Sequence, residues 1–185
     1  METTGILLPL EDGFMAGVVK RNYRMLVSRF SLQDDLSGSE LFVLNIHLAA
    51  FDNGETRVKQ LESVFEFAKK LHEKGHFVVI GGDWNMRLVQ TEFPHETDEE
   101  FLFWLRDLPA DKVPVGWSIA ADASIPSVRT VHKSYVKGEN YVAVVDGFIV
   151  SPNVEIISIE NVDLGFENSD HHPVKLKFKL NMDNQ

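Results

Sequence analysis

Cysteine is absent from the 185 residues, which excludes disulfides and thiolate metal sites. Any bound metal must therefore have oxygen or imidazole ligands, which suit Mg²⁺, Mn²⁺ or Ca²⁺. No apolar run is long enough to cross a bilayer, and no basic and apolar segment typical of an export signal opens the chain. We therefore expect a cytoplasmic protein without a membrane span.

Basic residues are scarce: 18 Lys and Arg face 28 Asp and Glu, which gives a net charge of −10. This balance argues against broad contact with duplex DNA, but it is compatible with a small anionic substrate bound through a metal. Repeats and low-complexity linkers are also absent. The length and the 44% hydrophobic content predict a single domain over residues 1–185 with a sizeable core.

The first half of the chain has the pattern of a strand–helix–strand unit. We predict strands over 23–32 and 41–48, a helix over 56–74 that ends at Gly75, and a strand over 76–82. Short joints between these segments are typical of an α/β fold.

The second half predicts another helix and three more strands. Thr97 and Glu100 have the spacing of a capping box, and apolar residues follow at helical spacing, so we expect a short helix over 97–109. Irregular structure should follow to residue 140. Strands are then predicted over 141–150, 154–162 and 173–180, the last alternating between apolar residues and lysines.

Asp83 and Asn85 follow a buried strand and two glycines, in the segment VVIGGDWNMR. In extended backbone both side chains project to one side and Trp84 to the other. Asp, Asn and Gly are common turn residues, but the end of a buried strand is also where α/β sheets bind ligands. A turn and a site are about equally good readings of this pair.

His47 and Asp146 interrupt apolar strands. His47 shares a face with Asn45 near the end of its strand, where a hydrogen-bonded core histidine is the more common case. A buried, ionised Asp146 without a partner would be costly, so we expect it to have one, and histidine is the natural candidate.

The segment NSDHHPV places Asp170, His171 and His172 before the last strand. It reads either as a decorated turn or as a site in which Asp170 contacts a metal and His171 transfers a proton. Taken with the other strand ends, these side chains suit metal-assisted attack of water on a phosphoester.

Together the segments LNIHL, VVIGGDWN, VVDGFIV and SDHHPV, with Arg57 and Gln60 in the helix, resemble the endonuclease/exonuclease/phosphatase superfamily, which is deoxyribonuclease-I-like. Their order and rough spacing agree from residue 41 to the end. The resemblance implies a mixed β-sheet sandwich flanked by helices, of the α/β (α+β) class, and a Mg²⁺- or Mn²⁺-dependent hydrolase.

The resemblance also implies roles at the matching positions. His47 would contact phosphate, and Asp146 would orient His171, the general acid or base. Asp83 would orient or deprotonate the attacking water or hold a second metal, and Asn85 would hold the phosphate or that metal. Asp170 would lie near the metal. The predicted site residues are catalytic His47, Asp83, Asn85, Asp146 and His171; metal-binding Asp170, Asp83 and Asn85; and substrate-binding Asn45 and Arg129.

The substrate class stays open between nucleic acid, nucleotides, and phospholipids or inositol phosphates. The segment IPSVRTVHKSY could line the mouth of the site through Arg129, His132, Lys133 and Tyr135, or Arg129 and Lys133 could simply solvate a surface loop. Both readings have equal weight.

One departure from the pattern concerns the start of the chain. The resemblance implies earlier strands that end in an Asn and in a Glu that is the main Mg²⁺ ligand, but only forty residues precede Leu41. We therefore expect an incomplete sandwich with weak metal affinity, and either a homo-oligomer or an N-terminal partner that covers the exposed surface. The alternative function is a weak or inactive remnant that acts as a binding module or as one piece of a two-chain enzyme.

Overall fold

A six-stranded mixed sheet forms the centre of the structure, a computed structural model that describes residues 1–10, 22–32, 38–50 and 54–182. β3 and β4 are parallel and connected by α1 (Glu55–His72), and the other neighbouring strands are antiparallel. The spatial order is β1 (Glu2–Leu7), β2 (Arg24–Ser31), β3 (Glu40–His47), β4 (Phe77–Asp83), β8 (Asp146–Val150) and β5 (Ser118–Ala120).

The remaining strands form two short antiparallel pairs. These are β9 (Val154–Asn161) with β10 (Val174–Leu180), and β6 (Val128–Arg129) with β7 (Val142–Ala143). Two 3₁₀ turns, η2 (Glu99–Leu102) and η3 (Ala110–Lys112), lie between β4 and β5.

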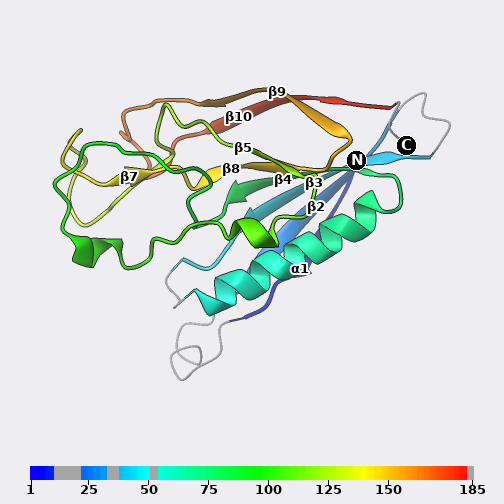
Figure 1. The fold of residues 1–185 in the computed structure, drawn as a ribbon, viewed down its shortest axis with the longest axis horizontal. Helices are drawn as coiled ribbons and strands as arrows, with labels where there is room; N and C mark the ends of the chain where they lie inside the picture. The colour runs from blue at the N-terminus through cyan, green and yellow to red at the C-terminus, as the bar shows by residue number, and fades with distance from the viewer. Residues whose placement is uncertain (11–21, 33–37, 51–53, 183–185) are drawn as a thin grey trace.

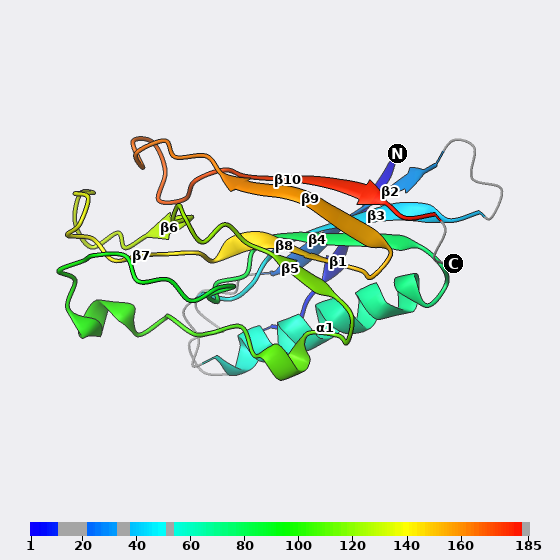
Figure 2. The same cartoon turned by 45° about the horizontal axis from the view of Figure 1, so that its top comes forward.

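Three layers are visible in Figure 1, with β9 and β10 above, the main sheet in the middle and α1 below. The view in Figure 2 shows the same order. One core lies between the sheet and α1, and a second lies between β4, β8 and the β9–β10 layer. This arrangement confirms the predicted mixed-sheet sandwich of the α/β class.

α1 forms where the helical periodicity predicted it, over 55–72 rather than 56–74. Gly54, with φ of 98°, precedes it, and Gly75, with φ of 84°, follows it. Its apolar residues Leu61, Val64 and Ala68 are fully buried against the sheet. No helix of the described residues has both the length and the hydrophobicity that crossing a bilayer requires.

The second predicted helix, over 97–109, is wrong. The segment contains only the 3₁₀ turn η2. The Thr97 hydroxyl does not cap a helix, because it donates to the carbonyl of Glu139 at 3.1 Å and accepts from the amide of Tyr141 at 2.7 Å. The Thr97 hydroxyl, on which the capping prediction depended, is therefore used in a contact with a distant segment.

The strand predicted over 141–150 is interrupted at its middle. Residues 144 and 145 leave the sheet ladder, and their carbonyls accept from Leu88 and Trp84 at 3.0 Å each. The chain following β4 therefore pairs with the break between β7 and β8.

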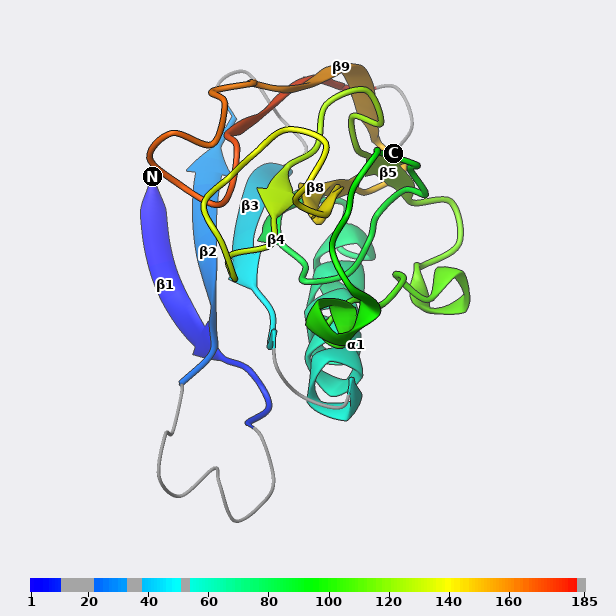
Figure 3. The same ribbon diagram turned by 90° about the vertical axis from the view of Figure 1, so that its left-hand side faces the viewer.

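The β9–β10 layer packs on one face of the main sheet. On that face, β1 and β2 have little cover. Figure 3 shows β1 at the left edge of the sheet, away from α1. Gly5 pairs with Leu26, so these two residues share a face. Leu26 is 45% exposed and Leu7 is 51% exposed. The second layer thus covers only part of the sheet.

Candidate active site

Three predicted site residues form a row across adjacent strands. His47 ends β3, Asp83 ends β4 and Asp146 begins β8, and the register pairs His47 with Asp83 and Asp83 with Asp146. His47 Nε2 lies 3.5 Å from Asp83 Oδ2. The sheet itself therefore sets the spacing of these side chains.

The two glycines before Asp83 allow this close approach. Gly82 has φ of 138°, and a Cβ built there would lie 2.0 Å from the carbonyl oxygen of Ile46. A Cβ at Gly81 would lie 2.5 Å from the ring of Phe148. A side chain at Gly82 would force β4 away from β3, and one at Gly81 would require the Phe148 ring to move.

Asp83 and Asn85 form a closed turn whose polar groups face the site. Asp83 Oδ1 accepts from the Asn85 amide at 2.8 Å, and Oδ2 accepts from Asn85 Nδ2 at 3.2 Å. Asn85 has φ of 50°, a conformation that Asn tolerates well. Trp84 points the other way, is fully buried and donates from Nε1 to the carbonyl of Gly147. The turn and the site are therefore one structure.

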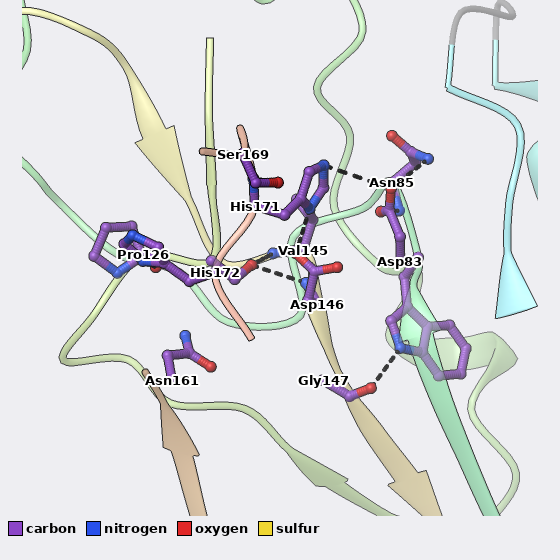
Figure 4. A network of polar contacts seen from close by, with 12 residues as sticks. Asp83, Asn85, Pro126, Val145, Asp146, Gly147, Asn161, Ser169, His171 and His172 are labelled. Atoms are coloured by element: carbon purple, nitrogen blue, oxygen red, sulfur yellow. Dashed lines mark hydrogen bonds and ion pairs between the residues drawn. The ribbon is translucent and has the colours of Figure 1, made fainter. Parts of the chain in front are cut away.

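Asp146 does have a histidine partner, as its position predicted. Its Oδ2 lies 2.8 Å from His171 Nδ1. Figure 4 shows the His171 ring beside Asp83 and Asn85, and His171 Nε2 lies 3.8 Å from Asp83 Oδ2. The His171 amide donates to the Ser169 hydroxyl at 3.1 Å, which closes the turn before β10.

These charges shift one another's pKa values. Burial of His171 opposes its charged form, but the hydrogen bond and charge of Asp146, with Asp83 and Asp170, raise its pKa to about 9. Burial and the charge of Asp146 raise the pKa of Asp83, although His171 and the Asn85 amide oppose this shift. A protonated His171 therefore faces a carboxyl that holds a proton more readily than usual.

Ser127 positions both halves of the Asp146–His171 pair. It is fully buried, and its hydroxyl accepts from the amides of Val145 at 2.9 Å and Asp146 at 3.0 Å. Its carbonyl accepts from the amide of His172 at 2.8 Å. Nothing in the sequence points to Ser127, because a serine in an irregular segment carries no motif.

Arg129 and Asp170 lie beside this centre, in a cleft of about 270 Å³ that Asn85 and His171 also line. The Arg129 amide donates to the Asp170 carbonyl at 3.0 Å. Its Nη1 donates to the Thr130 carbonyl, and its buried Nε has no hydrogen-bond partner among the described residues. Arg129 therefore brings a cationic donor to the site.

The other residues predicted near the mouth divide into two groups. His132 lines the cleft with Arg129. Lys133 instead pairs with Glu139 at 2.8 Å, and Tyr135 packs edge-on against Phe166. Only the first group is placed to contact a substrate in this cleft.

Asn45 lies apart from the cleft. It lines a separate groove of about 250 Å³ with Gly81 and Asp146, on the face toward β10. The structure therefore does not bring this predicted substrate-binding residue to the same cavity as Arg129.

Arg57 was part of the motif set but had no predicted role. It is 1% exposed and donates to four backbone carbonyls, including those of Ala49 and Asn85 at 2.5 Å each and of Trp104 at 3.0 Å; the fourth is that of Ala50. It fixes the loop after β3, the turn after β4 and the η2 segment in one place. The sequence signal for this role was an arginine in line with the apolar stripe of the predicted helix.

His172 is a structural residue. It is 4% exposed and stacks on Phe166 with ring centroids 3.6 Å apart. Its Nε2 accepts from the Phe166 amide at 3.2 Å, so Nδ1 carries the proton and donates to the Pro126 carbonyl at 2.9 Å. These contacts hold the turn that presents His171.

Comparison of the sequence with protein-family models gives no match, and neither does comparison with curated proteins. Solved structures do match in fold. One is the Danio rerio TDP2 complexed with single-strand DNA product, at 18% identity and a TM-score of 0.59, covering 97% of this chain and 67% of that chain.

Two further solved structures also match in fold. A mannosyl-6-phosphatase of Bacteroides thetaiotaomicron has 17% identity and a TM-score of 0.54, with 85% and 57% of the chains covered. The human Nocturnin catalytic domain with bound sulfate has 14% identity and a TM-score of 0.56, with 97% and 59% covered. The chain thus spans about two thirds or less of these proteins. Other matches are named as endonuclease/exonuclease/phosphatase, and the chain has that fold.

Proposed function

We propose that the protein is a divalent-metal-dependent phosphoester hydrolase that acts in the cytoplasm. The observation that carries the proposal is the convergence of His47, Asp83 and His171, with both histidine Nε2 atoms within 3.8 Å of Asp83 Oδ2. The fold supports it, since the neighbours include a mannosyl-6-phosphatase and a complex with a DNA product.

Each residue has a role that its surroundings suit. Asp83, whose pKa is raised, orients a water and accepts its proton as the water oxygen bonds to phosphorus. His171, which Asp146 keeps protonated, gives its Nε2 proton to the departing oxygen as that P–O bond breaks. Arg129 and His47 donate to the phosphoryl oxygens. Asn85 Nδ2 already donates to the Leu48 carbonyl and to Asp83, which leaves its Oδ1 to face a cation.

The side chains present fit a hard divalent cation in part. Ligand atoms of Asp83, Asp146 and His171 lie within 4.8 Å of one another, and the mutual repulsion of the two carboxylates is what a cation would relieve. Asp146 Oδ2 is already bonded to His171, so Asp83 and Asn85 would hold the ion. Asp170, also predicted as a ligand, is not among the three residues whose ligand atoms converge here. A bound Mg²⁺ or Mn²⁺ would supply charge neutralisation at phosphorus.

The test is hydrolysis of bis-p-nitrophenyl phosphate and p-nitrophenyl phosphate with Mn²⁺. Asp83→Ala and His171→Ala should each lower kcat/KM by at least about a hundredfold, whereas Lys175→Ala, an exposed change on β10, should leave it unchanged. Turnover that survives both active-site substitutions would come from a contaminant and would refute the proposal.

The uncovered β1–β2 surface favours the second candidate function, a binding module or one piece of a two-chain enzyme. Leu7 on β1, an edge strand, and Leu26 on the neighbouring β2 expose apolar area. We expect concentration-dependent association in sedimentation, weakened by Leu26→Lys. A monomer at every concentration, with no binding of an apolar dye, would contradict this expectation.

A further inference from the structure

The cleft beside His171 is lined by side chains of two chemical kinds. Asn85, Asp170 and His171 are polar and belong to the candidate active site. The others include an aromatic wall, by which we mean Phe101, Phe103, Trp104 and His132. The cleft, of about 270 Å³, lies just below the usual range for small-molecule sites, so it has room for a group the size of a single ring system.

Part of this wall is exposed, although the chain buries most of its large apolar residues. Phe103 is 60% exposed, Phe101 is 37% exposed and the neighbouring Val131 is 64% exposed. Trp84 and Phe77, by contrast, are fully buried. A cluster of exposed apolar side chains at the rim of a cleft is typical of a binding surface.

The wall is held at a fixed distance from the catalytic groups. Phe101 and His132 stack with ring centroids 4.3 Å apart and planes 9° from parallel, which joins two distant segments. Trp104 Nε1 donates to the Phe101 carbonyl at 3.1 Å. Arg57 donates to the carbonyls of both Trp104 and Asn85, so one buried guanidinium fixes the wall and the catalytic turn.

The charges around the wall disfavour a second phosphate. The cations that line the cleft, Arg129 and the protonated His171, both lie beside Asp170 in the chain fold, where the reacting group would bind. Glu99 and Glu100, in the same turn as Phe101, are exposed and acidic. A polyanion crossing the wall would meet these carboxylates, whereas a neutral ring would not.

We infer that the aromatic wall is a subsite for a flat aromatic ring carried by a single phosphoester. Resting on the proposed function, this assignment names the substrate class as small aromatic phosphoesters, either mononucleotides or aryl esters, rather than long nucleic acid. The ring stacks on the wall while the phosphoryl group lies against Asn85, Arg129 and His171.

The test measures calorimetric binding of phosphonates and phosphates that differ only in the attached group. Phenylphosphonate and adenosine 5′-monophosphate should bind about tenfold more tightly than methylphosphonate. Cyclohexylphosphonate should bind less well than the phenyl compound. The stronger of the two aromatic ligands identifies the source of the ring, and either result supports the subsite.

Substitutions in the aromatic wall test whether the preference for aromatic ligands arises there. Phe103→Ala and Phe103→Leu should remove the advantage of the aromatic ligands and leave methylphosphonate binding unchanged. Ile157→Ala removes a comparably exposed apolar side chain from β9 and should change nothing. Equal binding of phenyl- and methylphosphonate by the wild type, or a preference that survives Phe103→Ala and Phe101→Ala, would overturn the inference.

A second measurement separates this inference from the proposed hydrolase activity. Adenosine and phenol carry the ring without phosphorus, and they should shift the NMR signal of Trp104 Nε1–H, assigned with Trp104→Phe. Such shifts in a protein without hydrolase activity would uphold the subsite and refute the activity. Hydrolysis without any such shift would uphold the activity and overturn the subsite.

Discussion

β4 and β1 belong to the same sheet, but their surroundings differ on both faces. Residues 77–81 of β4 are all buried, with α1 on one face and the β9–β10 layer on the other. β1 is exposed over nearly its whole length. The catalytic row lies at the ends of the covered strands, where Asp83 and Asp146 are only 15% and 13% exposed, whereas the His47 side chain is 68% exposed.

The largest difference between the two strands should appear at their glycines. Gly82→Ala places a Cβ against the Ile46 carbonyl at a positive φ, and we expect the free energy of unfolding to fall by about 3 kcal/mol or more. Gly5→Ala meets only ordinary contact with Arg24, 3.7 Å away, and should change it by less than about 1 kcal/mol. Urea unfolding measures both, and equal effects would show that β4 is not constrained as described.

A leucine pair tests packing without backbone strain. Leu44 on β3 is fully buried, so Leu44→Ala should cost about 2–5 kcal/mol of unfolding free energy. Leu26, on the neighbouring strand β2, is 45% exposed, and Leu26→Ala should cost less than about 1 kcal/mol. If Leu26→Ala is as destabilising as Leu44→Ala, that side of the sheet is covered in solution.

The Asp146–His171 pair should make stability depend on pH in the alkaline range. The folded pKa of His171, about 9, exceeds the ordinary value of 6.5. The stabilisation is therefore complete below pH 6.5 and is lost as the pH rises through about 9. The facing charges are Asp146, Asp83 and Asp170.

Thermal unfolding of metal-free protein between pH 6 and 10 measures this loss, and NMR titration of the His171 ring gives its pKa directly. Asp146→Asn should lower that pKa and flatten the profile. A His171 that titrates at its ordinary value in the wild type would show that the pair does not form in solution.

The smallest expected effect is that of metal on the free protein. Since only a few oxygen ligands converge on Asp83, calorimetry should show millimolar rather than micromolar affinity for Mg²⁺ and Mn²⁺. At tenfold excess over Kd this binding would add only about 1.4 kcal/mol of stability. Asp83→Asn should abolish the binding, whereas tight one-site binding would reveal a ligand outside the set described above.

The spacing of apolar residues correctly predicted those helices and strands in which buried and exposed positions alternate regularly along the chain. The helix over α1 and the alternation in β10 were confirmed because each residue has the same kind of neighbour as the residue one period away. The helix predicted over 97–109 was wrong because Thr97 bonds to a distant segment. Two of its apolar residues, Phe101 and Trp104, line the cleft, whereas Leu108 is buried in the core between the sheet and α1.

The candidate site shows the same division. Its histidine and carboxylate types, and the need of Asp146 for a partner, could be read from strand ends and from the cost of a buried charge. The support from Ser127 and the separation of Asn45 from Arg129 could not, because no periodicity links these residues.

By itself, the sequence determined the regularly patterned elements, such as α1 and β10, and which side chains can do acid–base and phosphate chemistry, since both follow from local spacing and residue type. The tertiary structure alone decided which of those side chains meet, how a buried Arg57 joins the catalytic turn to the aromatic wall, and which side of the sheet stays open. The physical reason is that these contacts join segments far apart in the chain, and only the packed sheet fixes their distances.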